Sequence, residues 1–96
     1  MRISKTFKIG EEAVGGKINV LIKNKTIIIS ALDWYDETSI VSAHFLIYGD
    51  KSKHYIKMFL NELTTHYYSE KILDWIETKI KFEDEFNPYV NIFSLN

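Results

Sequence analysis

The three histidines are the side chains best suited to acid–base or metal chemistry near neutral pH. His54 and His66 fall in one predicted helix, where their spacing turns them about 120° apart around the axis. They therefore cannot hold one metal ion as an i, i+4 pair would. His44 falls on a partly apolar face of a predicted strand, where we expect a hydrogen-bonded structural histidine. The spacing favours structural roles over a metal or catalytic site.

Other catalytic signatures are absent from the sequence. It has no cysteine, no G-x-S-x-G motif and no glycine-rich phosphate loop, and Gly15-Gly16 is typical of a turn. Asp33, Asp36 and Glu37 lack the ligand spacing and glycine of a calcium loop, and Glu83-Asp84-Glu85 is typical of a solvated linker. We therefore expect no enzyme activity, no cofactor and no metal.

The segment Trp34-Tyr35-Asp36-Glu37 carries the clearest functional signal. Rigid aromatic side chains beside carboxylates on a connecting loop resemble the composition of a protein-binding hot spot. An equally open alternative is that Trp34 folds back and covers the end of the core. Farther along, Tyr67 is expected to point inward and Tyr68 outward. The predicted partner-binding residues are therefore Trp34, Tyr35, Asp36, Glu37 and Tyr68.

A basic cluster offers a different function. Lys51, Lys53, His54 and Lys57, with Tyr55 between them, fall at the start of a predicted helix, where positive charge opposes the helix dipole. A nucleic-acid interface could use Lys51, Lys53 and Lys57. Four basic residues without arginine make a weak nucleic-acid footprint, however, and a solvated helix face explains them better.

Composition limits the class of protein. The 96 residues are 46% hydrophobic with a net charge of −1, which predicts a single domain over residues 1–96 and argues against a strongly basic nucleic-acid binder. No apolar run reaches the ~18 residues needed to span a bilayer, and no signal-peptide pattern is present, so we expect a cytoplasmic protein. Fourteen isoleucines and eleven lysines against one arginine are typical of an AT-rich genome, such as those of some bacteria, phages and plasmids.

A β-hairpin is the clearest local structure in the sequence. Residues 17–23 alternate between polar and apolar side chains, and residues 26–32 are largely β-branched and apolar. Asn24 and Lys25 form the loop between them, and Asn24 can adopt the positive φ that two-residue loops need. Counting outward from the loop pairs Ile22 with Ile27, Val20 with Ile29 and Ile18 with Ala31, all on one face.

Two further strands are predicted over residues 3–9 and 40–48. The connections are too short for crossovers, so the four strands should form an antiparallel meander. In the strand over residues 40–48, both faces carry apolar side chains, and we expect the face with His44 and Leu46 to be at least half buried.

The residues after Gly49 change to a helical period. Two apolar stripes predict two helices; the first contains Ile56, Phe59, Leu60, Leu63 and Tyr67, and the second Ile72, Leu73, Ile76 and Ile80. In one continuous helix the stripes would lie on nearly opposite sides, so the chain should break near residues 66–69. Asp50 or Ser52 is expected to cap the first helix and Ser69 the second.

The predicted fold class is α+β: a four-stranded, mainly antiparallel β-meander with two helices on one face and a C-terminal extended segment. Residues 87–95 are too apolar for a disordered tail, and an edge strand and a docked arm both stay open.

By elimination, the sequence predicts a small non-enzymatic domain that binds another protein, such as a phage- or plasmid-type inhibitor or an immunity protein. The alternatives are a nucleic-acid-binding module and a self-associating protein, for instance a homodimer. Self-association would use the strand at Ile40–Tyr48 or edge pairing of Val90–Leu95.

Overall fold

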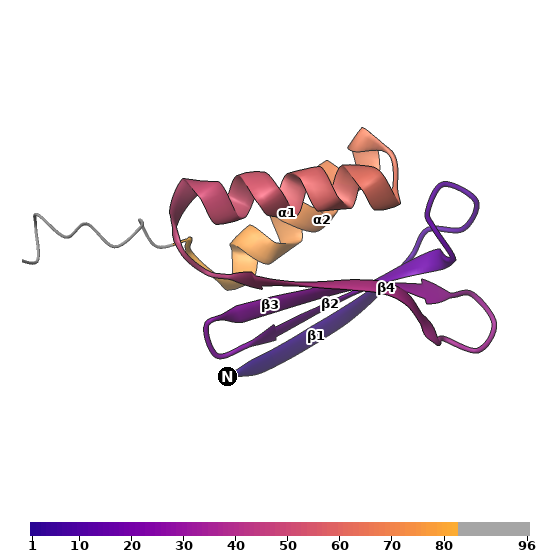
Figure 1. Ribbon diagram of the computed structural model, residues 1–96, viewed down its shortest axis with the longest axis horizontal. Helices are drawn as coiled ribbons and strands as arrows, with labels where there is room; N and C mark the ends of the chain where they lie inside the picture. Colours follow the sequence, from indigo (N-terminus) through magenta and orange to yellow (C-terminus); the bar gives the residue numbers. More distant parts are fainter. Residues whose placement is uncertain (83–96) are drawn as a thin grey trace, which may run out of the picture.

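The sheet is a four-stranded antiparallel meander, as predicted. The computed structural model describes residues 1–82, and its strands lie in the order β1-β2-β3-β4, so every strand pairs with its neighbours in sequence (Figure 1). The strands are β1 (Arg2–Lys8), β2 (Gly16–Lys23), β3 (Thr26–Asp33) and β4 (Ser39–Leu46).

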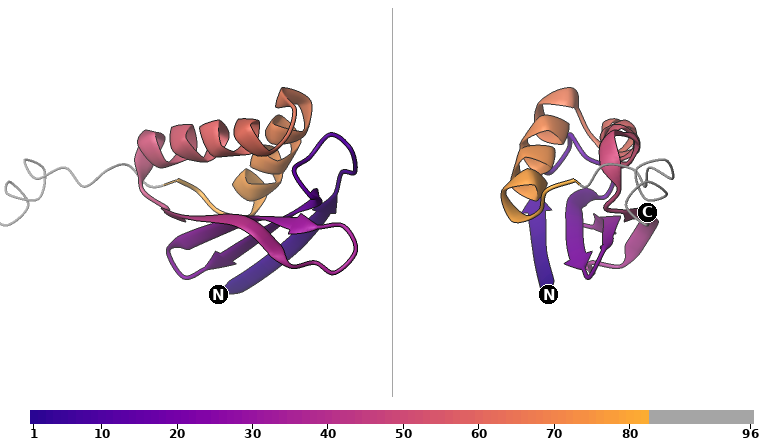
Figure 2. Two further views of the ribbon diagram at one scale, coloured as in Figure 1. Left: turned by 45° about the vertical axis from the view of Figure 1, so that its right-hand side comes forward. Right: turned by 90° about the vertical axis from the view of Figure 1, so that its left-hand side faces the viewer.

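Two helices cover one face of this sheet, which confirms the predicted α+β architecture. They are α1 (Gly49–Leu63) and α2 (His66–Lys79). In the end-on view of Figure 2, α1 lies over the β4 side and α2 over the β1 side. Aromatic pairs join each helix to its strand. Phe45 lies 5.7 Å from Phe59 between ring centroids, and Phe7 lies 5.7 Å from Trp75 in an edge-to-face arrangement.

The core lies between the sheet and the helices. Alternate residues of β2 and β3 point into it, because successive side chains of a strand face opposite sides. The apolar side chains without exposed surface are Ile18, Val20, Ile22, Ile27, Ile29 and Ala31 from the sheet, with Ile56, Leu60 and Ile76 from the helices.

The β2–β3 hairpin has the register derived from its pattern. Ile22 pairs with Ile27, and Val20 pairs with Ile29. Asn24 has a φ of 55°, so it takes the left-handed conformation that the loop requires. Lys25 is not among the residues with positive φ, which explains how lysine is accepted where glycine is common.

The helix boundaries differ from the prediction. The break falls at Thr64 and Thr65 rather than at residues 66–69, and Ser69 is fully buried inside α2 instead of capping it. The long β1–β2 connection sets this position, because the Val14 amide donates to the Leu63 carbonyl at 2.8 Å and Ala13 bridges to Thr64. At the other end of α1, the N-cap residue is Tyr48, which makes no side-chain hydrogen bond there. The predicted caps Asp50 and Ser52 both fall inside the helix, so neither occupies the N-cap position.

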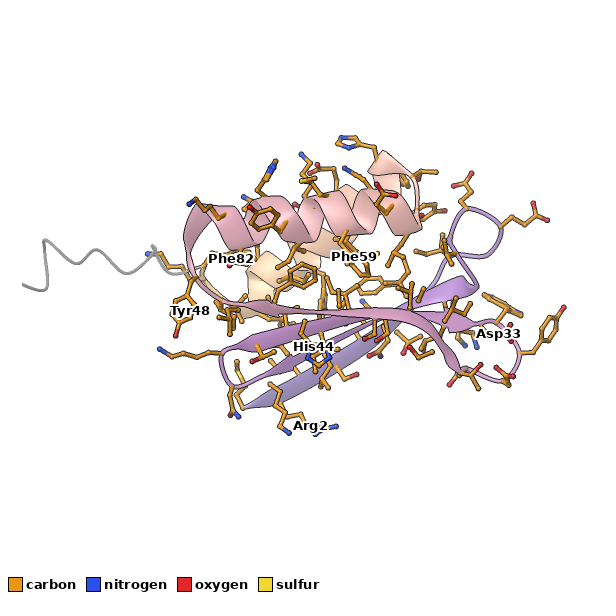
Figure 3. The ribbon with its side chains drawn as sticks, viewed as in Figure 1. Arg2, Asp33, His44, Tyr48, Phe59 and Phe82 are labelled. Atoms are coloured by element: carbon orange, nitrogen blue, oxygen red, sulfur yellow. The ribbon has the colours of Figure 1, made fainter. Side chains whose placement is uncertain are left out.

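Strand β4 is less buried than predicted. It spans Ser39–Leu46 with an irregularity at Ile40, and its face opposite the helices is open, with Leu46 56% exposed. The prediction that this face is half buried was wrong because both helices pack on the other side. Figure 3 shows His44 on the open side, where its side chain is exposed.

The segments predicted beyond Phe82 lie outside the described residues. They are Glu83–Glu85, the extended segment 87–95 and the edge-pairing stretch Val90–Leu95. Across residues 1–82, neither helix combines the length and the apolar character needed to cross a membrane.

Candidate functional site

Two loops at one end of the sheet form the candidate site. The Trp34 loop (residues 34–38) joins β3 to β4, and the glycine loop (residues 9–15) joins β1 to β2. In the view of Figure 1 both loops lie at the right-hand end of the sheet. Tyr35 is 91% exposed and Trp34 is 41% exposed, so the aromatic pair predicted from the sequence does reach the surface.

Hydrogen bonds from the loop to its own carboxylates fix its conformation. Asp33 Oδ1 accepts from the backbone amides of Tyr35 at 2.9 Å and Asp36 at 3.2 Å. Asp36 Oδ1 in turn accepts from the amide of Thr38 at 3.0 Å and from its hydroxyl at 2.8 Å. These bonds hold the pKa of Asp36 below its usual value, because they stabilise the ionised carboxylate. Of the predicted binding residues, Asp36 thus has a structural role, because it orders the loop together with Asp33.

Lys17 anchors the loop from below, and sequence reasoning missed it. The residue is only 7% exposed, and its ammonium donates to Glu37 Oε1 at 2.9 Å. The same ammonium lies 5.1 Å from the ring centroid of Trp34. Its hydrogen bond and charge hold the pKa of Glu37 below the usual value. The signal was present in the hairpin register, which places Lys17 opposite Leu32, beside the start of the loop.

Trp34 combines the two alternatives that the sequence left open. A Cβ added to Gly16 would lie 3.1 Å from Trp34 Cε3, so the ring packs closely against the start of β2. With Lys17 on it as well, the indole covers this end of the sheet. Two fifths of its surface still faces solvent next to Tyr35.

A shallow hollow of about 370 Å³ lies between the two loops. Trp34 and Tyr35 line one side, and Gly10, Glu11, Ala13 and Gly15 line the other. A larger hollow of about 660 Å³ lies at the opposite end of the sheet and is lined by Lys25, Ile47 and Phe82 among others. Its lining reaches Phe82, the last residue that the structure describes, whereas the smaller hollow is lined by the two loops and the first residue of β2. The smaller one is therefore part of the candidate site.

Tyr67 and Tyr68 lie the opposite way round from the prediction. Tyr67 is 61% exposed, and Tyr68 is only partly exposed. The prediction continued the stripe of α1 through Tyr67, but α1 ends at Leu63 and α2 has its own phase. In α2, Tyr68 precedes the buried Ile72 by one helical turn and so turns inward. Tyr68 also lies on a helix and not in either loop of the candidate site.

The basic cluster is engaged within the fold. Lys53 Nζ lies 3.2 Å from Glu77 Oε2, and Lys57 Nζ lies 2.7 Å from Glu70 Oε1. Both pairs join α1 to α2, and the hydrogen bond from Lys57 holds the pKa of Glu70 below its usual value. Lys51 is exposed in the first turn of α1. Two of the three lysines predicted for nucleic-acid binding thus tie the helix pair together.

No potential metal site of three or more histidine or acidic side chains is found within residues 1–82. We compared the chain with protein-family models, with curated proteins and with solved structures, and none of the three comparisons gave a match.

Proposed function

We propose that this protein is a binding domain that recognises another protein through the Trp34 loop. The observation that carries the proposal is an aromatic side chain, Tyr35, 91% exposed on a loop that its own hydrogen bonds hold in one conformation. Exposure of this kind leaves apolar area to be covered, and a fixed loop loses little conformational entropy when a partner covers it.

The surroundings of Tyr35 suit a protein partner. The hollow beside it can receive one partner side chain, Glu11 supplies a polar group in its lining, and Glu37 lies two residues along the loop from Tyr35. An apolar centre with a charged rim is the usual anatomy of a protein–protein interface. Glu37 stays 57% exposed in its side chain although it is paired with Lys17, so it can contact a partner as well.

The role that fits these features is an inhibitor or immunity protein of a phage or other mobile element, which acts by covering a target enzyme. The support for this finer assignment is compositional, namely the isoleucine- and lysine-rich, arginine-poor sequence. The nucleic-acid alternative loses support because Lys53 and Lys57 are paired with Glu77 and Glu70.

The test compares three tagged baits in a lysate from a bacterium with an AT-rich genome: the wild type, Tyr35→Ala and the control Tyr67→Ala. Tyr67 is also exposed but lies on α2, outside the site. We expect a stoichiometric protein that survives nuclease, stays with the control and is lost with Tyr35→Ala. Thermal melting should be the same for all three. Equal capture by Tyr35→Ala, or capture that disappears with nuclease, would contradict the proposal.

A further inference from the structure

The two edges of the sheet differ sharply in charge. Strand β1 carries Arg2, Lys5 and Lys8, the kind of charged residues that keep an edge strand from pairing with other chains. Strand β4 has the sequence SIVSAHFL and contains no Asp, Glu, Lys or Arg. Within residues 1–82 its outer edge pairs with no strand, because β4 ends the strand order. The right-hand view of Figure 2 shows β4 at this outer side, beneath α1.

The sequence of β4 is self-complementary about Ala43. In an antiparallel pair, residues directly opposite each other lie on the same face. If two copies of β4 pair with Ala43 on the two-fold axis, Val41 lies opposite Phe45 on the helix side, and Ser42 lies opposite His44 on the open side. Apolar residues then meet apolar ones and polar residues meet polar ones. The regular part of the strand supplies all these pairs, since the irregularity falls outside it, at Ile40.

We propose that β4 pairs with β4 of a second copy of this chain, antiparallel and with Ala43 on the two-fold axis. The two four-stranded sheets then form one continuous sheet with α1 of each copy above the junction. Val41, 39% exposed in the single chain, is covered by Phe45 of the other copy. The Phe45–Phe59 pair extends this contact from the sheet to α1.

The edge of β4 fits β4 of a second copy better than it fits β1 of a second copy. Pairing β4 with β1 would be a head-to-tail contact, which leaves an unpaired edge at each end unless it closes into a ring. It would also set the lysines of β1 against a strand without acidic residues. Pairing β4 with itself closes after two copies. It also places no two like charges opposite each other, because β4 contains no Asp, Glu, Lys or Arg.

A cysteine cross-link tests the position of the axis, because the natural sequence contains no cysteine. Directly opposed residues of antiparallel strands have Cα atoms about 4.5–5.5 Å apart, within the range of a disulfide. Ala43→Cys should therefore give a covalent dimer on mild oxidation. Leu46→Cys is the matched control on the same strand, because its two copies would lie six residues apart, roughly 20 Å. Equal cross-linking of both variants, or of neither, would overturn the proposal.

A charge swap tests the pairing by a second route. Ser42→Lys with His44→Lys sets lysine against lysine twice across the axis, and sedimentation equilibrium should show a dimer dissociation constant raised roughly tenfold or more. Ser42→Lys with His44→Glu should restore the dimer, since each lysine then faces a glutamate. Both variants lose the Ser30–Ser42 hydrogen bond equally, and circular dichroism should report the same fold for both.

A single-chain mass for the wild type at high concentration would overturn the proposal. A monomer whose β4 amides are protected from hydrogen exchange would overturn it as well. The edge of β4 would then be covered by another part of the same chain. Failure of the Trp34 loop to bind a partner leaves these masses unchanged, so the outcomes of the two proposals are separate.

Discussion

Lys17 and Glu37 connect the sheet to the candidate site. The lysine ammonium is buried at the start of β2, and it donates to a carboxylate oxygen of Glu37 at 2.9 Å. Glu37 also adopts a positive φ of 57°, so its backbone turns the chain while its side chain holds the turn in place. This ion pair ties the Trp34 loop to the sheet, while the hydrogen bonds of Asp33 and Asp36 hold the conformation of the loop.

Stability should depend on the ionisation of Glu37. Because Lys17 holds its pKa below the usual 4.5 in the folded protein, the ionised carboxylate stabilises the fold above the unfolded-state pKa. That stabilisation is lost as the pH falls through the folded-state pKa. Glu37→Gln should therefore lower the free energy of unfolding at neutral pH, and the difference from the wild type should shrink towards pH 3. Urea unfolding over this pH range measures it, and a difference that does not change with pH would contradict the assignment.

Gly15 should tolerate no side chain. Its φ is 73°, and an added Cβ would lie 2.4 Å from both Ile40 Cδ1 and the Leu32 carbonyl oxygen. Gly15→Ala should therefore cost about 2–4 kcal/mol, from left-handed backbone strain together with overpacking. Gly10→Ala is the matched control, since Gly10 also has a positive φ of 83° but open space around it, and it should cost only about 1–2 kcal/mol. Equal costs in urea unfolding would show that the contacts of Gly15 do not matter.

Ser69→Ala should stabilise the protein. The serine is fully buried in α2, and its hydroxyl finds no hydrogen-bond partner within the described residues. Alanine removes a buried polar group and favours helix, so we expect a gain of about 1–2 kcal/mol in urea unfolding. The exposed Ser42→Ala serves as the control and should bring no gain, because Ser42 is hydrogen-bonded to Ser30. A loss of stability in Ser69→Ala would mean that its hydroxyl is satisfied.

Asn24 should be replaceable by glycine but not by alanine. Alanine at position 24 would have to adopt a φ of 55° without the polar side chain that helps asparagine to do so. Asn24→Ala should therefore lower the free energy of unfolding by about 1 kcal/mol. Asn24→Gly should lie within a few tenths of a kcal/mol of the wild type, because glycine accepts this conformation freely. Thermal or urea unfolding of the two variants distinguishes them, and equal effects would contradict a left-handed Asn24.

The fold was predictable where local patterns decide it. The β2–β3 register follows from Asn24 and the alternation around it, and it is the observed one. Contacts between distant segments could not be predicted from local patterns. The helix break is set by Val14 and Ala13, which lie about fifty residues away from it, so the predicted cap at Ser69 was wrong. Burial of the second face of β4 failed for the same reason, because it depends on where the helices pack.

The candidate site was predictable in part. Trp34 and Tyr35 were identified from residue type and loop position, and both reach the surface. Lys17 was missed because a lysine in an alternating strand is usually solvated, whereas here it is buried with its ammonium against Trp34 and Glu37. The inward turn of Tyr68 required the phase of α2, which depends on the true position of the break.

The bridge between Ala13 and Thr64 has a consequence for how the chain is made. During synthesis the meander can form strand by strand, since each strand pairs only with its sequence neighbours. The glycine loop has hydrogen bonds of its own between Gly10, Ala13 and Gly16, but its bonds to Leu63 and Thr64 can form only after those two residues have been translated. One wall of the hollow beside Tyr35 is therefore joined to the helix layer only after the first helix has been translated, although it is encoded near the start of the chain.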